Sequence, residues 1–179
     1  MKTSLDKTVD FSFADKDALS PAEVHALVHM INEVYTEAEQ GLFKPGILQR
    51  TTPQEILTLL ECHELMLLTT QGEIKGCVQV KRTADNSLKI GMITIAPALK
   101  GQGYGKLMMQ LIETHARSNG VDRLELELLT PRTWVQDHKD FLHRWYTRIG
   151  FKKVRVIPFE RQDLLATECE FTLYAKPLT

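Results

Sequence analysis

Apolar residues recur at steps of three and four positions over long stretches of the chain, and this spacing predicts amphipathic helices. Two of these stretches begin with a hydroxyl residue, a proline and a glutamate, at Ser20–Glu23 and at Thr52–Glu55, which is the pattern of a capping box. A third such stretch begins at about Gly103. It is predicted to end before Gly120, because glycine is favoured just after the last residue of a helix. The predicted helices cover residues 21–38, 53–60, 103–119 and 137–149, the last closed by Gly150.

Shorter apolar runs, separated by polar turns, predict β-strands. Gln71-Gly72 predicts a hairpin turn, and Ala96-Pro97 ends a strand because proline cannot donate a hydrogen bond to a sheet. The predicted strands cover residues 11–14, 64–70, 73–83, 88–95, 123–129, 151–157 and 168–175. The order of strands and helices predicts an α/β (α+β) fold in which a mixed sheet carries helices on both faces.

Length and composition fit one folded domain over residues 1–179. With 43% apolar and 25% charged residues, the chain can bury a core and keep a soluble surface. Its 22 basic and 23 acidic side chains nearly cancel, and this balance disfavours nucleic acid and anionic membranes as partners. A local basic site for one small anion is compatible with it.

Neither a membrane span nor a disulfide framework is predicted. The sequence has no apolar run of about 18 residues, and Met1–Asp10 lacks the apolar centre of a signal peptide. Cys62, Cys77 and Cys169 are far apart and form no CxxC pair, which favours a reducing cytoplasm and argues against structural zinc. The histidines show no metal-binding spacing, so no metal site is expected.

The segment from Ile93 to Leu107 carries the clearest chemical signal. A predicted strand ends there, a loop follows, and three alternating glycines (Gly101, Gly103 and Gly105) open a helix. Amides at the start of a helix are unpaired and partly positive, and glycines let them approach a phosphate closely. The spacing fits neither a P-loop nor a dinucleotide-binding fingerprint, so a nucleotide-dependent oxidoreductase is disfavoured. A glycine turn that serves packing alone is the structural alternative.

Two motifs make the sequence similar to the GNAT superfamily of acyl-CoA-dependent N-acyltransferases. Lys100–Gly105 (Lys-Gly-Gln-Gly-Tyr-Gly) resembles the family signature at both glycines, with lysine where the family has arginine or glutamine. Trp145–Phe151 resembles a second motif, an aromatic-Tyr pair followed by Gly-Phe. The resemblance is specific over residues 88–154. It implies a mostly antiparallel, twisted sheet of about seven strands with about four helices, and acetyl-CoA as cosubstrate without a metal.

The resemblance also implies which residues bind coenzyme A. The glycine loop would hold the pyrophosphate, and the backbone of Ile93–Ile95 would pair with the pantetheine arm as an added strand does. Lys139 stands where the family often has asparagine, and it either reaches a coenzyme phosphate or is solvated. The implied coenzyme-binding residues are Ile93, Thr94, Ile95, Lys100, Gly101, Gln102, Gly103, Tyr104, Gly105, Lys106 and Lys139.

Transfer of an acyl group to an amine needs a neutral amine, whereas an alkyl amine with a pKa of about 10.4 is protonated at neutral pH. A carboxylate can remove that proton, directly or through water. Leucine and glutamate alternate over residues 124–129, which places Glu125 and Glu127 on one face of a strand. A similar segment carries the general base in GNAT members that acetylate protein N-termini, so the resemblance implies this role for Glu127. The alternative is a solvated or ion-paired glutamate, with Arg123 or Arg132 as partner.

The thiolate that leaves needs a proton, and a closely placed tyrosine can supply one. The resemblance implies that Tyr146, four residues before Gly150, is this general acid. The alternative is an aromatic side chain that only packs the last helix against the sheet. A backbone amide near Thr94 or Ile95 is expected to stabilise the oxyanion.

The function predicted from the sequence is therefore an N-acetyltransferase that moves an acetyl group from acetyl-CoA directly to a primary amine of a small molecule or peptide, in a ternary complex. The alternative is a non-catalytic acyl-CoA-binding or sensing module of the same fold. Polyamines, amino acids, aminoglycosides and protein N-termini all stay open as acceptors, with Glu37 and Glu39 favouring a cationic amine. Residues 35–50 and 130–140 either border the acceptor pocket or form surface loops. The oligomeric state is open, and a homodimer is compatible with the sequence.

Overall fold

The computed structural model describes residues 9–15, 17–47 and 49–178. The expectation for the start of the chain falls mostly on residues 1–8, which lie outside the described ones. None of the helices in the described ranges is long and apolar enough to span a membrane. The elements are β1 (Val9–Phe13), α1 (Pro21–Ala38), α2 (Pro53–Glu61), β2 (Leu65–Thr70), β3 (Glu73–Arg82), β4 (Ser87–Ile95), η1 (Pro97–Leu99), α3 (Tyr104–Ser118), β5 (Arg123–Pro131), α4 (Asp137–Arg148), β6 (Lys152–Ile157), η2 (Gln162–Leu164) and β7 (Cys169–Pro177).

Both predicted capping boxes are present. The Ser20 hydroxyl accepts a hydrogen bond from the Glu23 amide at 3.3 Å, while the Ser20 amide donates to the Glu23 carboxylate at 2.7 Å. Thr52 and Glu55 repeat the arrangement at 3.2 and 3.0 Å. These bonds satisfy amides that would otherwise lack a partner at the start of α1 and α2, so the helices begin where the sequence predicts.

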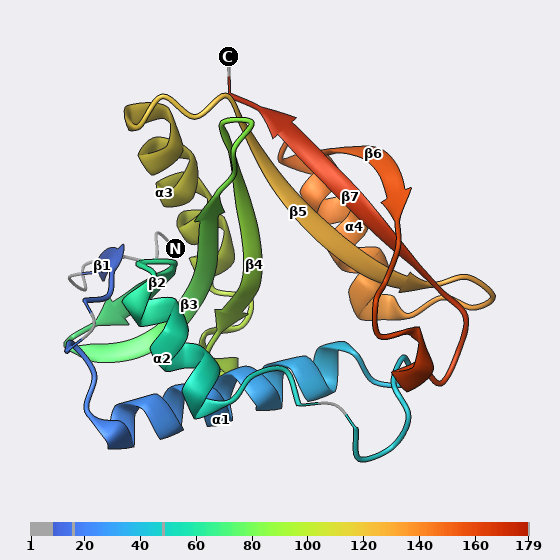
Figure 1. Ribbon diagram of the computed structural model, residues 1–179, viewed down its shortest axis with the longest axis horizontal. Helices are drawn as coiled ribbons and strands as arrows, with labels where there is room; N and C mark the ends of the chain where they lie inside the picture. Colours follow the sequence, from blue (N-terminus) through green and yellow to red (C-terminus); the bar gives the residue numbers. More distant parts are fainter. Residues whose placement is uncertain (1–8, 16, 48, 179) are drawn as a thin grey trace, which may run out of the picture.

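The described residues form one seven-stranded sheet in the order β1-β2-β3-β4-β5-β7-β6 (Figure 1). Neighbouring strands are antiparallel except β4 and β5, which run parallel. With the four α-helices of the same described ranges, this arrangement confirms the predicted mixed, mostly antiparallel α/β fold. The strand ends differ from the prediction by one or two residues; for example, β7 continues to Pro177 because it pairs with the whole of β5.

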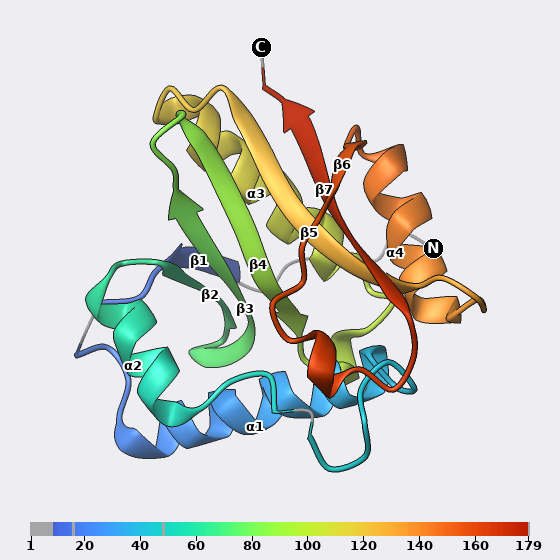
Figure 2. The same cartoon turned by 45° about the vertical axis from the view of Figure 1, so that its right-hand side comes forward.

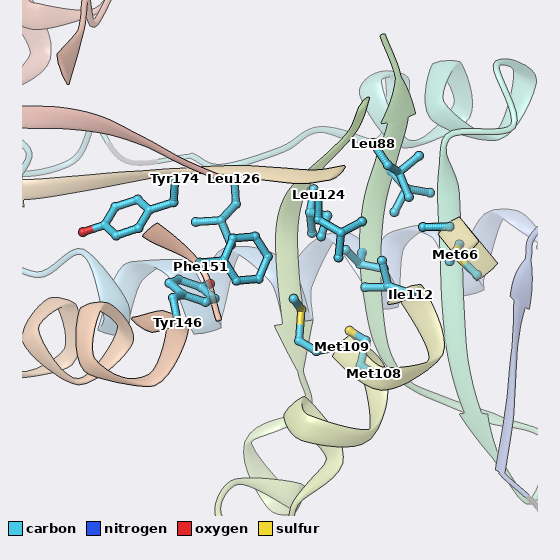
Figure 3. Close-up of a cluster of buried hydrophobic side chains, with 14 of the residues drawn as sticks. Met66, Leu88, Met108, Met109, Ile112, Leu124, Leu126, Tyr146, Phe151 and Tyr174 are labelled. Atoms are coloured by element: carbon cyan, nitrogen blue, oxygen red, sulfur yellow. The ribbon is translucent and has the colours of Figure 1, made fainter. Parts of the chain in front are cut away.

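Each face of the sheet has its own apolar core. On one face, Met108, Met109 and Ile112 of α3 pack against Leu124 of β5, and Tyr146 of α4 packs beside them near Phe151 (Figure 3). On the other face, α1 and α2 pack against buried residues of β2, β3 and β4, namely Leu65, Leu67, Cys77 and Met92. The two helix layers therefore hold the sheet from both sides, as predicted.

A β-bulge interrupts β4. Cys77 of β3 pairs with Thr94 and Gln79 pairs with Gly91, so that both Met92 and Ile93 oppose the single residue between them on β3. Met92 adopts a positive φ of 51°. The extra residue reverses the alternation of β4: Ile90 belongs to the core under α3, whereas Met92 is buried under α1 and α2.

Beyond the bulge, β4 and β5 separate. Their parallel pairing covers only Ser87–Ile90 with Arg123–Leu126, although both strands continue further. Figures 1 and 2 show the two strands close together at one end and apart at the other, with α1 crossing near the open end. The fold thus creates a gap in the middle of the sheet, and both edges of this gap carry unpaired backbone.

We expect the close approach of β3 and β4 at Gly76 to tolerate no side chain. A Cβ atom there would lie 2.6 Å from the Thr94 carbonyl oxygen and 3.2 Å from the Met108 methyl group, so Gly76→Ala must displace backbone. The variant is expected to lose about 1 to 3 kcal/mol of unfolding free energy. In the control Gly91→Ala, the new Cβ would lie 3.6 Å from the Gln79 amide oxygen, and we expect a change within about 0.5 kcal/mol. Urea denaturation measures both, and equal midpoints would contradict the packing argument.

Candidate active site

A cavity of about 990 Å³ lies at the gap between β4 and β5. We call it the central cavity. It is lined by α1, β3, β4, the loop that leads into α3, β5, α4, and by the loops that precede α2 and β7. Most of the residues predicted from the sequence line it together: Ile93, Ile95, Lys100, Gly101, Gly103, Tyr104, Gly105, Lys106, Glu127, Lys139 and Tyr146.

Thr94 and Gln102 are the predicted site residues whose side chains face elsewhere. Thr94 is buried, and its hydroxyl donates to the Met92 carbonyl at 3.2 Å. Gln102 is exposed, and its amide group donates to the Ala98 carbonyl at 2.8 Å. For these two positions only the backbone is left to serve a ligand in the cavity.

The glycine loop presents a row of free amides. Gly101 and Gly103 adopt positive φ values of 77° and 87°, which favour glycine, and a Cβ on either would meet nothing within 4 Å. Within the described residues, the amides of Gly101, Gly103, Tyr104, Gly105 and Lys106 donate to no protein acceptor. They lie at the start of α3, where the helix dipole adds partial positive charge, so the loop can bind an anion.

The edge of β4 that faces the gap offers further hydrogen-bonding groups. The Ala96 amide donates to the Lys75 carbonyl at 2.8 Å, so it faces β3. Because amides alternate in direction along a regular strand, the Thr94 amide also faces β3, while the Ile95 amide and the Ile93 carbonyl, which opposes the Thr94 amide in the same peptide unit, face the gap. An extended molecule in the gap could pair with Ile93 and Ile95 as an additional strand.

Two lysines of the predicted site form ion pairs with α1. Lys100 contacts Glu37 at 2.7 Å, and both side chains are largely exposed. Lys139 contacts Glu39 at 3.0 Å, and here the side chains are only 6% and 11% exposed. The expectation that Lys139 is solvated is therefore wrong, because the ammonium is buried and engaged by Glu39. Contact with a coenzyme phosphate stays a prediction that requires this pair to open.

These two ion pairs change the charge expected near the acceptor. From the sequence alone, Glu37 and Glu39 favour a cationic amine, because both are acidic and lie near the expected acceptor side. The structure neutralises each with a lysine from a distant part of the chain. Neither carboxylate is left to attract a cation.

Glu127 lines the central cavity and contacts Lys89 at 2.6 Å. Leu124, Leu126 and Leu128 are buried on the opposite face of β5, so the predicted alternation is confirmed. The sequence leaves ion pairing with Arg123 or Arg132 as the alternative for these glutamates. Glu125 does contact Arg123 at 2.7 Å, whereas Glu127 pairs with Lys89, which the sequence did not indicate.

Tyr146 is buried at the cavity wall, where its ring contacts those of Trp145 and Phe151. Burial raises the pKa of Tyr146, and the nearby Tyr35 raises it further, so the phenol keeps its proton at neutral pH. Burial likewise raises the pKa of Tyr35 to about 12, although the neighbouring Arg50 charge lowers it in part. Arg50 lies over the Tyr35 ring, with 5.1 Å from the guanidinium carbon to the ring centre.

The loops before α2 and before β7 complete the cavity. They are joined by backbone bonds from the Lys44 amide to the Leu164 carbonyl at 3.0 Å and from the Ala166 amide to the Leu42 carbonyl at 2.8 Å (Figure 2). Together with the start of β7 they form what we call the loop wall, consisting of Phe43, Gln49, Arg50, Phe159, Arg161 and Phe171.

The segment of residues 35–50 thus contributes side chains to the central cavity, among them Tyr35 and Arg50, and its contact with an acceptor stays a prediction. Arg132 and Trp134 of the 130–140 segment do not line it; the Trp134 indole instead donates to the Thr167 hydroxyl at 3.2 Å. Sequence analysis did not single out Lys89, Phe159, Arg161 or Phe171. Lys89 lies on β4, Phe171 lies on β7, and Phe159 and Arg161 share the loop between β6 and η2; no local motif marks them.

The described residues contain no group of three or more histidine, cysteine, aspartate and glutamate side chains placed to bind a metal ion. The sequence matches the acetyltransferase (GNAT) family over residues 27–151, which include the glycine loop and the Trp145–Phe151 motif. The chain belongs to the GNAT acetyltransferase family. Family membership supports an acyltransferase and agrees with the two motifs recognised in the sequence.

Solved structures of GNAT acetyltransferases share the fold of this GNAT chain. The PaiA N-acetyltransferase of Thermoplasma acidophilum, in complex with coenzyme A, is 12% identical with a TM-score of 0.70, covering 95% of this chain and 99% of its own. A GNAT-family acetyltransferase of Desulfovibrio desulfuricans is 16% identical with a TM-score of 0.66, covering 96% and 99%. The ribosomal-protein-S18-alanine N-acetyltransferase of Escherichia coli is 15% identical with a TM-score of 0.63, covering 96% and 94%. At these identities the likeness shows the fold.

The two lysine–glutamate pairs of this GNAT chain give a matched test of burial. Lys139→Met leaves Glu39 buried without its partner, and we expect a loss of about 3 kcal/mol of unfolding free energy. The double variant Lys139→Met with Glu39→Gln should recover much of that loss, since no charge stays unpaired. Lys100→Met, which breaks the exposed pair with Glu37, should leave the urea midpoint nearly unchanged. Equal losses for Lys139→Met and Lys100→Met would contradict this assignment.

Proposed function

We propose that the protein is an N-acetyltransferase that moves an acetyl group from acetyl-CoA directly to a primary amine while both substrates are bound. One observation carries the proposal: the row of free amides in the glycine loop opens into the same cavity as Tyr146 and Glu127. Acetyl-CoA supplies an activated thioester, and the chain's own residues bind it, orient the amine and move the protons.

The glycine loop suits the pyrophosphate of coenzyme A. The amides of Gly101 and of residues 103–106 are free, Gly101 and Gly103 leave open space before them, and no side chain within the described residues occupies them. Lys106 adds a cationic side chain without an acidic partner among the described residues. The Ile93 carbonyl and the Ile95 amide suit the pantetheine arm, because its own amide groups can pair with the exposed edge of β4.

Glu127 is the proposed general base. It lies on the wall of the central cavity, and an amine that enters the cavity as an ammonium ion must lose a proton before it can attack. The ammonium of Lys89 at 2.6 Å orients the Glu127 carboxylate. The proton passes to Glu127 directly or through a water molecule.

Tyr146 is the proposed general acid. Its phenol is protonated at neutral pH, and because burial raises the pKa, its proton passes to the sulfur only in concert with breaking of the thioester bond. The Ile95 amide, which faces the gap, is the proposed donor to the oxyanion. These roles need no covalent bond between the protein and the acetyl group.

Removing the Tyr146 hydroxyl tests the chemistry apart from binding. We expect Tyr146→Phe to lower turnover by roughly 10²- to 10⁴-fold while coenzyme affinity stays nearly constant. Tyr174→Phe is the control, because its hydroxyl contacts His143 at 2.8 Å and does not line the cavity. Free-thiol release from acetyl-CoA over a panel of amines measures turnover, and calorimetry measures coenzyme binding. Wild-type protein that binds acetyl-CoA but releases no thiol with any amine would identify a non-catalytic acyl-CoA-binding module instead.

The glycine loop is tested by Gly103→Ala. A side chain at a φ of 87° is strained by about 1 to 2 kcal/mol, so the loop amides should move and the coenzyme dissociation constant should rise roughly tenfold. Gly120→Ala is the matched control, since it places a side chain at a positive φ of 63° at the other end of α3, outside the cavity lining. Titration calorimetry with coenzyme A compares both variants with the wild type, and an unchanged affinity in Gly103→Ala would remove the loop from the binding site.

A further inference from the structure

The charges that line the central cavity do not balance. Its acidic lining residues are Glu37, Glu39 and Glu127, and each of them is paired with a lysine. A further lining lysine, Lys81, pairs with Glu64 at 3.2 Å. Arg50 and Arg161 of the loop wall have no acidic partner among the described residues. The loop wall is therefore left with two uncompensated positive charges.

Arg50 is held in place within this wall. The Asn32 side-chain oxygen accepts hydrogen bonds from the Arg50 amide at 2.7 Å and from the Thr51 amide at 3.0 Å. The Asn32 amide group also donates to the Thr51 carbonyl at 3.0 Å, and the guanidinium rests on the Tyr35 ring. A partly buried guanidinium keeps its charge, and burying a charge is costly unless an opposite charge compensates it.

The position of Arg50 relates it to the proposed reaction centre. Tyr35, which carries the guanidinium on its ring, is close enough to Tyr146 to raise the pKa of Tyr146, as a smaller cause beside burial. Arg50, Tyr35 and Tyr146 also line the same cavity. An amine placed for transfer beside Tyr146 therefore shares this cavity with the guanidinium.

Apart from Gln49, the rest of the loop wall is aromatic. Phe159 contacts Phe43 and Phe171 edge-to-face, with ring centres 6.2 and 5.2 Å apart. The two loops that supply Phe43 and Phe159 lie side by side (Figures 1 and 2). A ligand against this wall would meet apolar rings next to cationic guanidinium groups.

We propose that the acceptor is a small amine that also carries a carboxylate, namely an amino acid with an apolar side chain. Its carboxylate binds Arg50, Arg161 adds positive potential, and its side chain packs on Phe43, Phe159 and Phe171. This inference rests on the proposed acetyl transfer. A polyamine or aminoglycoside is disfavoured, because each would place further positive charge beside unpaired guanidinium groups.

The reaction balances with no further reactant. The ammonium form of the amino acid loses one proton to Glu127, the nitrogen attacks the thioester carbonyl, and an N–C bond replaces the C–S bond. The sulfur takes up one proton from Tyr146, and the second proton that the nitrogen releases as the amide forms restores the Tyr146 phenol. The products are an N-acetylated amino acid, the free thiol of coenzyme A and one proton released to solvent.

Matched acceptors isolate the carboxylate. Phenylalanine, phenylalaninamide and 2-phenylethylamine share one apolar body, and leucine with leucinamide forms a second pair. We expect free-thiol release to give a kcat/KM roughly 10- to 100-fold higher for each amino acid than for its amide. Rates are compared between about pH 7 and 9, so that differences in amine basicity are separated from recognition of the carboxylate. Spermidine represents the cationic acceptors.

Variants then assign the recognition to the loop wall. Arg50→Gln should remove most of the preference for amino acid over amide, mainly through KM, and Arg161→Gln should reduce it less. Arg155→Gln is the matched control, because Arg155 is exposed on β6 outside the cavity lining. Thermal unfolding and coenzyme affinity, measured on each variant, separate a lost contact from a disturbed fold. A preference that survives in folded Arg50→Gln would overturn the assignment.

The outcomes separate the two proposals. Efficient thiol release with the amides or with spermidine, equal to or above that with the amino acids, would overturn the acceptor class and leave acetyl transfer standing. Binding of acetyl-CoA without thiol release for any acceptor would overturn acetyl transfer, and the acceptor class with it.

Discussion

The early end of the pairing between β4 and β5 is the constraint on which the site depends. β5 cannot follow β4 beyond Leu126, because it stays paired with β7 along its whole length. β4 is held on its other side by β3, and the bulge at Met92 turns the backbone after it. The same break opens the central cavity and leaves the Ile93 carbonyl and the Ile95 amide without a neighbouring strand. Space and hydrogen-bonding capacity therefore arise together, and the free amides at the start of α3 border the same cavity.

Local signals predicted the framework because the interactions behind them are local. Ser20 and Glu23 bond each other across one helical turn, and Leu124, Leu126 and Leu128 are buried because β5 alternates. The glycine loop was visible for the same reason, since its positive φ values and its place between strand and helix depend on few neighbours. Periodicity and spacing report such interactions directly.

The sequence could not reveal features that depend on distant partners. Lys139 and Glu39 are 100 residues apart, and nothing local distinguishes their buried pair from two solvated charges. The pairing of Glu127 with Lys89, rather than with the nearby Arg123, depends on how β4 and β5 are aligned. The bulge left one trace: Met92 and Ile93 are consecutive apolar residues in a strand that otherwise alternates. That trace fits many other strands, because a run of two apolar residues also occurs without a bulge.

The charge of the cavity follows from the same long-range pairing and differs from that of the chain. The whole sequence has a formal charge of −1, with acidic and basic residues almost equal in number. Within the cavity, every lining glutamate already contacts a lysine, so the charges left unpaired are those of Lys106 at the glycine loop and of Arg50 and Arg161 in the loop wall. A neutral chain can thus present a cationic pocket, because opposite charges cancel in pairs and not as an average over the surface. Lys106 lies at the loop proposed for the coenzyme phosphates, so the acceptor side is left with guanidinium groups, which bind carboxylates with matched geometry.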